Sequence, residues 1–290
     1  MNLIQQLVNG LVLGHAYALV AIGWTLLLGV ARLVNFGHGQ MYMLGAFVTW
    51  WAMSSAGAPY LLAVPIAMVA GALIGLLMQY VMLKATFQQN LVSIMIMTLG
   101  WGYLLQGVAA LVFGSTGQIL ETPLSVIDFP VSELWLTWQD VAIVVVTLVF
   151  FIALQLVLDK TKIGRLVRMV AEDPKLSQLS GINVRRIYYC VFAFEGAAVA
   201  FAAAMVAPRT PILTSMGFEE VIMTFVVVVV GGIGSVKGSY FAGIGLGVFT
   251  ALFGAYVSPA YTTAAAFLVL IMLLVIRPGG LSSSTGMGVH

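Results

Sequence analysis

The chain has 290 residues, enough for one or two ordinary domains. Hydrophobic residues make up 61% and charged residues 8%, against roughly 45–50% and about 25% in a typical soluble domain. So few charged side chains cannot cover a soluble surface, and the same values exclude a disordered chain. A net charge of +2 gives no reason to expect nucleic-acid binding, and one cysteine excludes a disulfide framework. The composition therefore predicts a protein that crosses the membrane several times.

Apolar runs along the chain predict an all-α fold with eight or nine transmembrane helices, in a single domain over residues 1–290. A membrane helix needs roughly 20 apolar residues to cross a hydrocarbon core of about 30 Å. The second and seventh runs are short and flanked by glycine, so we expect a broken or re-entrant helix among them. The predicted spans are residues 4–30, 41–56, 60–83, 91–113, 141–158, 188–207, 221–230, 240–257 and 263–276.

Charged residues are unevenly distributed between the connections. Residues 114–140 carry four acids and no base, whereas residues 159–187 carry seven bases against three acids. Because basic loops stay in the cytoplasm, we predict that 159–187 is cytoplasmic and 114–140 periplasmic. With nine spans, eleven of the twelve Lys and Arg residues then face the cytoplasm, and Arg209 is the exception. This arrangement predicts a periplasmic N-terminus and a cytoplasmic C-terminus.

Glycines recur at four-residue spacing within several of the predicted spans. In lipid, helices gain little from burying apolar area, so close backbone approach matters more for their association. The spacing predicts tightly packed helix pairs, and it leaves open whether those contacts are static or slide during transport. The pairs are Gly10 and Gly14, Gly71 and Gly75, and Gly243 and Gly247.

The richest polar cluster lies between the first two predicted spans, over residues 35–40. Glycines on both sides of a histidine disfavour a continuous helix, and unwound backbone near a membrane is tolerated only against protein or a wet cavity. One interpretation is a hinge or pathway element shaped by hydrogen bonds, and the other is a polar loop at the cytoplasmic edge. The candidate pathway or hinge residues are Asn35, Gly37, His38, Gly39 and Gln40, with Gly232 and Gly234 from a second glycine-rich break.

Glu195 is the one acid that falls inside a predicted span. Carboxylates at membrane depth are costly and usually face a partner or a wet cavity. Because no second buried acid accompanies Glu195, we prefer a structural pair, with Arg185 or Arg186 as the nearby bases, over a proton relay. The neighbouring acids at 219–220 are expected in an outer connection with Arg209. Three scattered histidines predict no metal site.

Residues 226–239 imitate a strand that leads into a phosphate-binding loop. The pattern fails because Val236 precedes the lysine and Gly238 follows it, where the motif needs Gly and then Ser or Thr. The sequence holds no such loop elsewhere. If the protein works with ATP, another chain must therefore supply the ATPase, and we expect no cofactor on this chain.

A short, well-capped helix is predicted within the basic connection 159–187. Asp173 is a good N-cap, Pro174 suits the first helical position, and Gly181 is placed to end the helix in a left-handed cap. Such a helix is more than a linker requires, which favours docking into a groove on a soluble partner over lying in the lipid headgroup plane. The candidate docking residues are Glu172, Asp173, Pro174, Leu176, Leu179 and Gly181.

Taken together, several segments resemble the permeases of branched-chain amino-acid ABC transporters, and the resemblance covers nearly the whole chain. It is closest to the first of the two permease subunit types, although members often carry Ala where this chain has Gly37. The segments are residues 14–19 with 35–46, residues 164–165 with 171–174 and 181–183, residues 230–235, and the Arg-Pro-Gly-Gly-Leu sequence at 277–281.

The resemblance implies an ABC importer permease fold in a bacterial inner membrane, on a chain that is not itself an enzyme. It implies a second, homologous but different permease, two cytosolic ATPases that bind ATP and magnesium, and a periplasmic substrate-binding protein. By this analogy the helix around 174–180 is the coupling helix that docks on an ATPase. Branched-chain amino acids are the leading substrate, with urea, short amides and aromatic acids as alternatives. A further alternative is an ion-coupled secondary transporter, which needs several buried ionisable residues where the sequence offers only Glu195.

Overall fold

The structure is a computed structural model that describes residues 3–86, 91–114, 116–126 and 134–281. All regular elements in this part of the chain are helical, and one isolated β-bridge joins Gln118 to Ile212. The α-helices are α1 (Leu3–Ala31), α2 (His38–Ser54), α3 (Tyr60–Thr86), α4 (Leu91–Phe113), α5 (Pro123–Val126), α6 (Trp138–Lys160), α7 (Lys162–Glu172), α8 (Pro174–Leu179), α9 (Val184–Val206), α10 (Met216–Gly231), α11 (Val236–Tyr256) and α12 (Thr262–Ile276). Two short 3₁₀ turns, η1 (Ala207–Arg209) and η2 (Pro259–Tyr261), complete the set.

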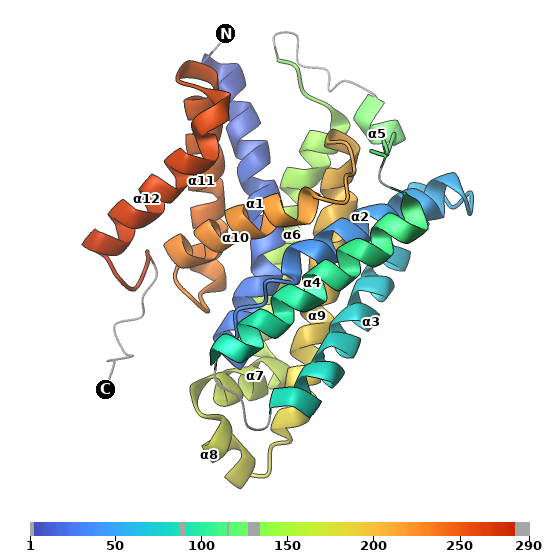
Figure 1. Cartoon of the computed structure of the whole chain (residues 1–290). Coiled ribbons are helices and arrows are strands. Elements are labelled where there is room, and N and C mark those ends of the chain that lie inside the picture. The colour runs from blue at the N-terminus through green and yellow to red at the C-terminus, as the bar shows by residue number, and fades with distance from the viewer. Residues whose placement is uncertain (1–2, 87–90, 115, 127–133, 282–290) are drawn as a thin grey trace.

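Seven of the described helices are long and apolar enough to cross a membrane. The two short runs, 41–56 and 221–230, form α2 and α10, which have only 17 and 16 residues. The prediction of eight or nine spans, some of them broken, therefore corresponds to seven full-length helices and two short ones. Figure 1 shows α10 crossing the molecule at a steep angle to α1.

Close glycine contacts join the helices in pairs, as the four-residue spacing predicts. A methyl group on Gly14 of α1 would lie 2.6 Å from the Cα atom of Ile244 in α11. A methyl group on Gly71 of α3 would overlap the backbone oxygen of Gly196 in α9. The backbones approach as closely as glycine allows, so helix packing accounts for this spacing. The same pattern recurs at Gly10 against Val248, Gly75 against Phe192, Gly243 against Ala18, and Gly247 against Gly14.

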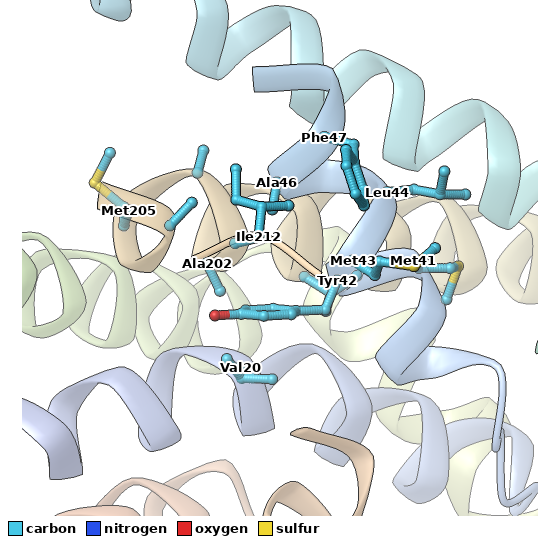
Figure 2. Close-up of a cluster of buried hydrophobic side chains, with 14 of the residues drawn as sticks. Val20, Met41, Tyr42, Met43, Leu44, Ala46, Phe47, Ala202, Met205 and Ile212 are labelled. Carbon is cyan, nitrogen blue, oxygen red and sulfur yellow. The ribbon is translucent and has the colours of Figure 1, made fainter. Parts of the chain in front are cut away.

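Helix α2 occupies the middle of the protein. Residues 38–47 are all buried, and α2 packs against α3, α4, α9 and α10. Figure 2 shows the Tyr42 ring between Val20 of α1 and Ala202 of α9. Because neighbouring helices shield it from lipid, α2 can begin with polar residues at membrane depth.

The two ends of the helix bundle differ in the connections they carry. At one end Gln5, near the start of α1, is hydrogen-bonded to the backbone of Trp135, and Arg209 Nε lies 3.0 Å from Asp140 Oδ1. At the other end lie α7 and α8 (Figure 1). The acidic connection 114–140 and the basic connection 159–187 are thus at opposite ends, although residues 115 and 127–133 of the former lie outside the described residues. Arg209, the one base assigned to the acidic side, pairs with an acid there.

Helix α7 has no counterpart among the predicted elements, because 159–187 was expected to be a charged connection with one short helix. Its Val167 and Val170 are buried, whereas Ile163, Leu166 and Met169 are exposed. The apolar residues therefore divide between a face packed on the protein and a face turned away from it. The prediction for this connection used only its length and charge, so it missed the amphipathic helix.

Candidate functional site

The break between α1 and α2 is shorter than expected. Residues 32–37 are not helical, but His38, Gly39 and Gln40 form the first turn of α2. The backbone N–H groups of Gln40 and Met41 both donate to the carbonyl of Gly37, and these bonds start the helix. The helix is thus interrupted between α1 and α2, as the sequence predicts, but α2 begins at His38, three residues before the predicted span 41–56. Gly39 is also a point of close packing, because a methyl group there would overlap the backbone oxygen of Gly217.

A buried polar cluster forms where this break meets α9. Asn35 Nδ2 donates to Glu195 Oε1 at 3.0 Å, and His38 Nδ1 lies 3.0 Å from the same oxygen. The exposed fraction of each of these three residues is 1% or less. The Trp24 ring stacks on His38 with a centroid separation of 5.1 Å and an interplanar angle of 12°. We call Trp24, Asn35, His38 and Glu195 the Glu195 cluster.

The Glu195 cluster joins residues that lie far apart in the sequence. Asn35 and His38 were candidate hinge residues, and Glu195 was expected to form a structural pair. The pair exists, but the partner predicted for Glu195 is wrong. Arg186 lies nine residues earlier on the same helix, which corresponds to about 14 Å along the helix axis. Arg185 lies over the ring of Tyr189 instead.

Hydrogen bonds from the same cluster shape the non-helical segment. Asn35 Oδ1 accepts from the backbone N–H of Gly37 at 2.9 Å, while its amide nitrogen holds Glu195. The backbone N–H of Phe36 donates to Thr98 Oγ1 in α4 at 3.1 Å. The segment is therefore fixed to both α4 and α9, with Asn35 and Gly37 buried and Arg32 exposed. Residues 32–37 connect the end of α1 to the centre of the protein.

The first turns of α2 and α10 meet beside this cluster. A methyl group on either Gly39 or Gly217 would collide with the backbone of the other residue. The Gln40 side chain is 1% exposed, and its amide nitrogen and oxygen have no hydrogen-bond partner within the described residues. Buried polar groups in proteins are usually paired, so this junction combines close backbone contact with an unpaired amide.

Glu219 and Glu220 lie in α10 and not in an outer connection, which corrects the prediction for these acids. Glu220 interacts electrostatically with Tyr17 of α1 and Tyr42 of α2. The available signal was an acid pair immediately before an apolar run, because acids are favoured in the first turn of a helix.

The second glycine-rich break is separate from the Glu195 cluster. Gly232 and Gly234 form the turn between α10 and α11, with φ angles of +100° and +82° that favour glycine. Gly234 packs against Gly29 of α1, and Gly232 packs against Gly280. The segment that imitates a phosphate-binding loop is thus a helix, a turn and a helix.

Helix α8 has the caps that its sequence predicts. Asp173 Oδ1 accepts from the backbone N–H groups of Lys175 at 2.8 Å and Leu176 at 3.0 Å. Gly181 follows the helix with a φ of +82°. Leu176 and Leu179 are 61% and 86% exposed, although both are large apolar residues. Glu172 is the last residue of α7, directly before the cap. We call residues 172–181 the α8 corner.

Comparison with known proteins identifies the family. The family described as "Branched-chain amino acid transport system / permease component" matches residues 6–276. This chain belongs to that family. The matched region contains the Glu195 cluster, the α8 corner and the junction of α2 with α10, and it ends at the last residue of α12.

Curated relatives of this permease match almost end to end. The high-affinity branched-chain amino acid transport system permease protein BraD of Pseudomonas aeruginosa is 32% identical over 96% of this chain and 95% of its own length. LivH of Escherichia coli K12, a permease protein of the same description, is 30% identical over 96% of this chain and 94% of its own. A probable LivH of Methanocaldococcus jannaschii is 26% identical over 94% and 90%.

Proposed function

We propose that this permease is a membrane subunit of an ABC importer that carries branched-chain amino acids across the bacterial inner membrane. The observation that carries the proposal is the family match over residues 6–276, together with relatives named as permeases of high-affinity branched-chain amino acid transport systems. The partners are a second, homologous but different permease, two cytosolic ATPases that bind ATP and magnesium, and a periplasmic substrate-binding protein. This chain supplies no catalytic residue.

The charge distribution supports a periplasmic N-terminus and a cytoplasmic C-terminus. The end of the bundle that holds α7 and α8 carries the basic connection 159–187. The opposite end carries the acidic connection 114–140, whose Asp140 pairs with Arg209. Basic connections are retained in the cytoplasm, so the α8 corner faces the side where the ATPases reside.

In this proposal the α8 corner is the surface that an ATPase moves. Leu176 and Leu179 are exposed on a helix outside the membrane, where large apolar side chains usually mark an interaction site. The Asp173 cap and the left-handed Gly181 fix both ends of this short helix. A push on the two leucines would therefore move the corner as a unit, and α7 would carry the displacement into the bundle.

The junction of α2 and α10 is the proposed moving part of the pathway. Its elements are the Glu195 cluster, the Gly39–Gly217 contact and the buried Gln40, while the glycine turn at 232–234 forms the opposite end of α10. Inward and outward states can exchange only if ATP and substrate bind them with different affinities. Short helices that begin inside the bundle provide a joint where backbone can shift without exposing polar groups to lipid.

Reconstitution tests the transport proposal directly. The permease is assembled with its second permease, ATPases and binding protein in liposomes, and valine uptake is measured. We expect uptake that requires ATP and the binding protein and survives dissipation of the proton gradient. Uptake without ATP that collapses with the proton gradient would contradict the proposal. Competition by urea, short amides or aromatic acids separates the alternative substrates.

Replacing Gly181 with Val tests the role of the α8 corner. A side chain at this position meets open space, so the substitution acts through the left-handed backbone alone. Gly57 is the matched control, because it has a φ of +66°, equally open surroundings and a place in the turn between α2 and α3, away from α8. We expect Gly181→Val to abolish the stimulation of ATPase activity by loaded binding protein and Gly57→Val to retain it. Equal stimulation in both variants would refute the assignment.

A further inference from the structure

Arg32 has an unusual backbone conformation at the end of α1. Among the described residues other than glycine, it alone has a positive φ, of +53°. Its backbone N–H still donates to the carbonyl of Leu28, so the residue closes the helix in the left-handed conformation that glycine normally supplies. A residue with a side chain adopts this conformation only at a cost in free energy. The Arg32 side chain forms two hydrogen bonds that glycine could not form.

The Arg32 guanidinium holds the end of α7. Nη2 donates to the carbonyl oxygens of Ala171 at 3.0 Å and Glu172 at 3.1 Å. These belong to the last turn of α7, where helix carbonyls lack intrahelical partners and the helix dipole favours a cation. The next residue, Asp173, is the N-cap of α8. Arg32 is therefore bound to the backbone at the point where the α8 corner begins.

On its other side, Arg32 opens the segment that leads to the Glu195 cluster. Three residues later Asn35 binds Glu195, and six residues later His38 binds the same carboxylate. The segment between them is short and is fixed to α4 through Phe36 and Thr98. It has little slack, so a displacement of the α7 end that carries Arg32 with it must also pull on Asn35 and His38.

We propose that Arg32 is the positioning residue that transmits movement of the α8 corner to the Glu195 cluster and the junction of α2 with α10. The inference rests on the proposed function, in which an ATPase moves the α8 corner. A planar guanidinium suits the task because it can donate to two neighbouring carbonyls from one side chain. The left-handed backbone at Arg32 directs the chain back into the bundle.

The test compares Arg32 variants in the complete complex in liposomes. Arg32→Gly keeps the left-handed backbone and removes the guanidinium, while Arg32→Lys keeps a cation with different geometry. Arg186→Ala is the control, because it removes an exposed arginine from the same end of the molecule. The measured quantity is valine transported per ATP hydrolysed, with complex assembly checked by size-exclusion chromatography.

For Arg32→Gly we expect valine transported per ATP to fall by about tenfold, the scale on which residues that couple two sites act. Arg32→Lys should fall between this variant and the wild type, and Arg186→Ala should match the wild type. A ratio in Arg32→Gly within twofold of wild type would overturn the inference. So would loss of assembly in both Arg32 variants, because Arg32 would then be a folding residue. If the wild-type complex itself transports no valine, the proposed function fails instead.

Discussion

Replacing Glu195 with Ala removes an acceptor that two buried donors share. Asn35 Nδ2 and His38 Nδ1 both lie 3.0 Å from Glu195 Oε1, and Glu195 is fully buried. Hydrogen bonds between membrane helices contribute about 0.6 kcal/mol on average and up to about 1.7 kcal/mol each. A buried donor that loses its partner also costs about 1–3 kcal/mol in desolvation. With two donors left behind, we expect Glu195→Ala to lower the free energy of unfolding by about 3 kcal/mol.

Glu195→Gln separates hydrogen bonding from charge. Because both donors bind the same carboxylate oxygen, one amide oxygen in its place can accept both bonds. Only the added strength of a charged acceptor is lost, which we place at about 1 kcal/mol in total on the scale for charged against neutral hydrogen bonds. Glutamine should therefore stabilise the protein clearly better than alanine at this position.

The assay is unfolding of the purified permease by SDS titration in mixed micelles, followed by the loss of helical circular dichroism. Gln155→Ala is the control, because it removes an exposed hydrogen bond of 2.8 Å to Asp159 and should change the free energy of unfolding by less than about 0.5 kcal/mol. A loss below about 1 kcal/mol in Glu195→Ala would refute the reasoning, on the scale of the interhelical bonds it removes. Equal losses in the alanine and glutamine variants would refute it as well.

Two further predictions concern the packing and the acidic end. Gly71→Ala should destabilise the α3–α9 contact, because its methyl group would overlap the Gly196 backbone. The control Gly100→Ala has open space around it, so it should be neutral or stabilise the protein by up to about 1 kcal/mol. The same SDS titration measures both variants, and equal effects would contradict this prediction. Asp140→Ala should lower the free energy of unfolding by about 1–3 kcal/mol, because it removes both the capping box with Thr137 and the ion pair with Arg209. Arg209→Ala removes only the ion pair and should have a smaller effect. The reverse order in the SDS titration would contradict this prediction.

Local sequence signals predicted the elements that depend on local physics. The α8 caps follow from Asp173, Pro174 and Gly181, whose preferences act within a few residues of each position. The glycine pairs anticipated tight helix contacts for the same reason, although not which helices would meet. By contrast, α7 was not predicted, because the many charged residues of 159–187 indicated a connection outside the membrane and gave no weight to the apolar residues Val167 and Val170.

Contacts between residues that are distant in the sequence could not be predicted. Glu195 and His38 are 157 positions apart, and a single sequence carries no signal that joins them. The positions of Glu219 and Glu220 depend on where α10 begins, and a helix that starts inside the bundle breaks the assumption that acids mark connections. The left-handed backbone at Arg32 could not be predicted from the sequence either, because that conformation is normally expected at glycine.

The proposed transport mechanism depends most on contact between the α8 corner and an ATPase, which cysteine cross-linking can measure in the assembled complex. Leu179, 86% exposed on α8, is replaced with Cys after the exposed native Cys190 has been changed to Ser. Leu61, 82% exposed at the start of α3, provides the control site. We predict that Leu179→Cys cross-links to the ATPase subunit in native membranes, to an extent that changes when ATP is added, whereas Leu61→Cys does not. An α8 corner that cross-links to no ATPase, or that reacts only with a thiol reagent applied from the periplasm, would contradict the account.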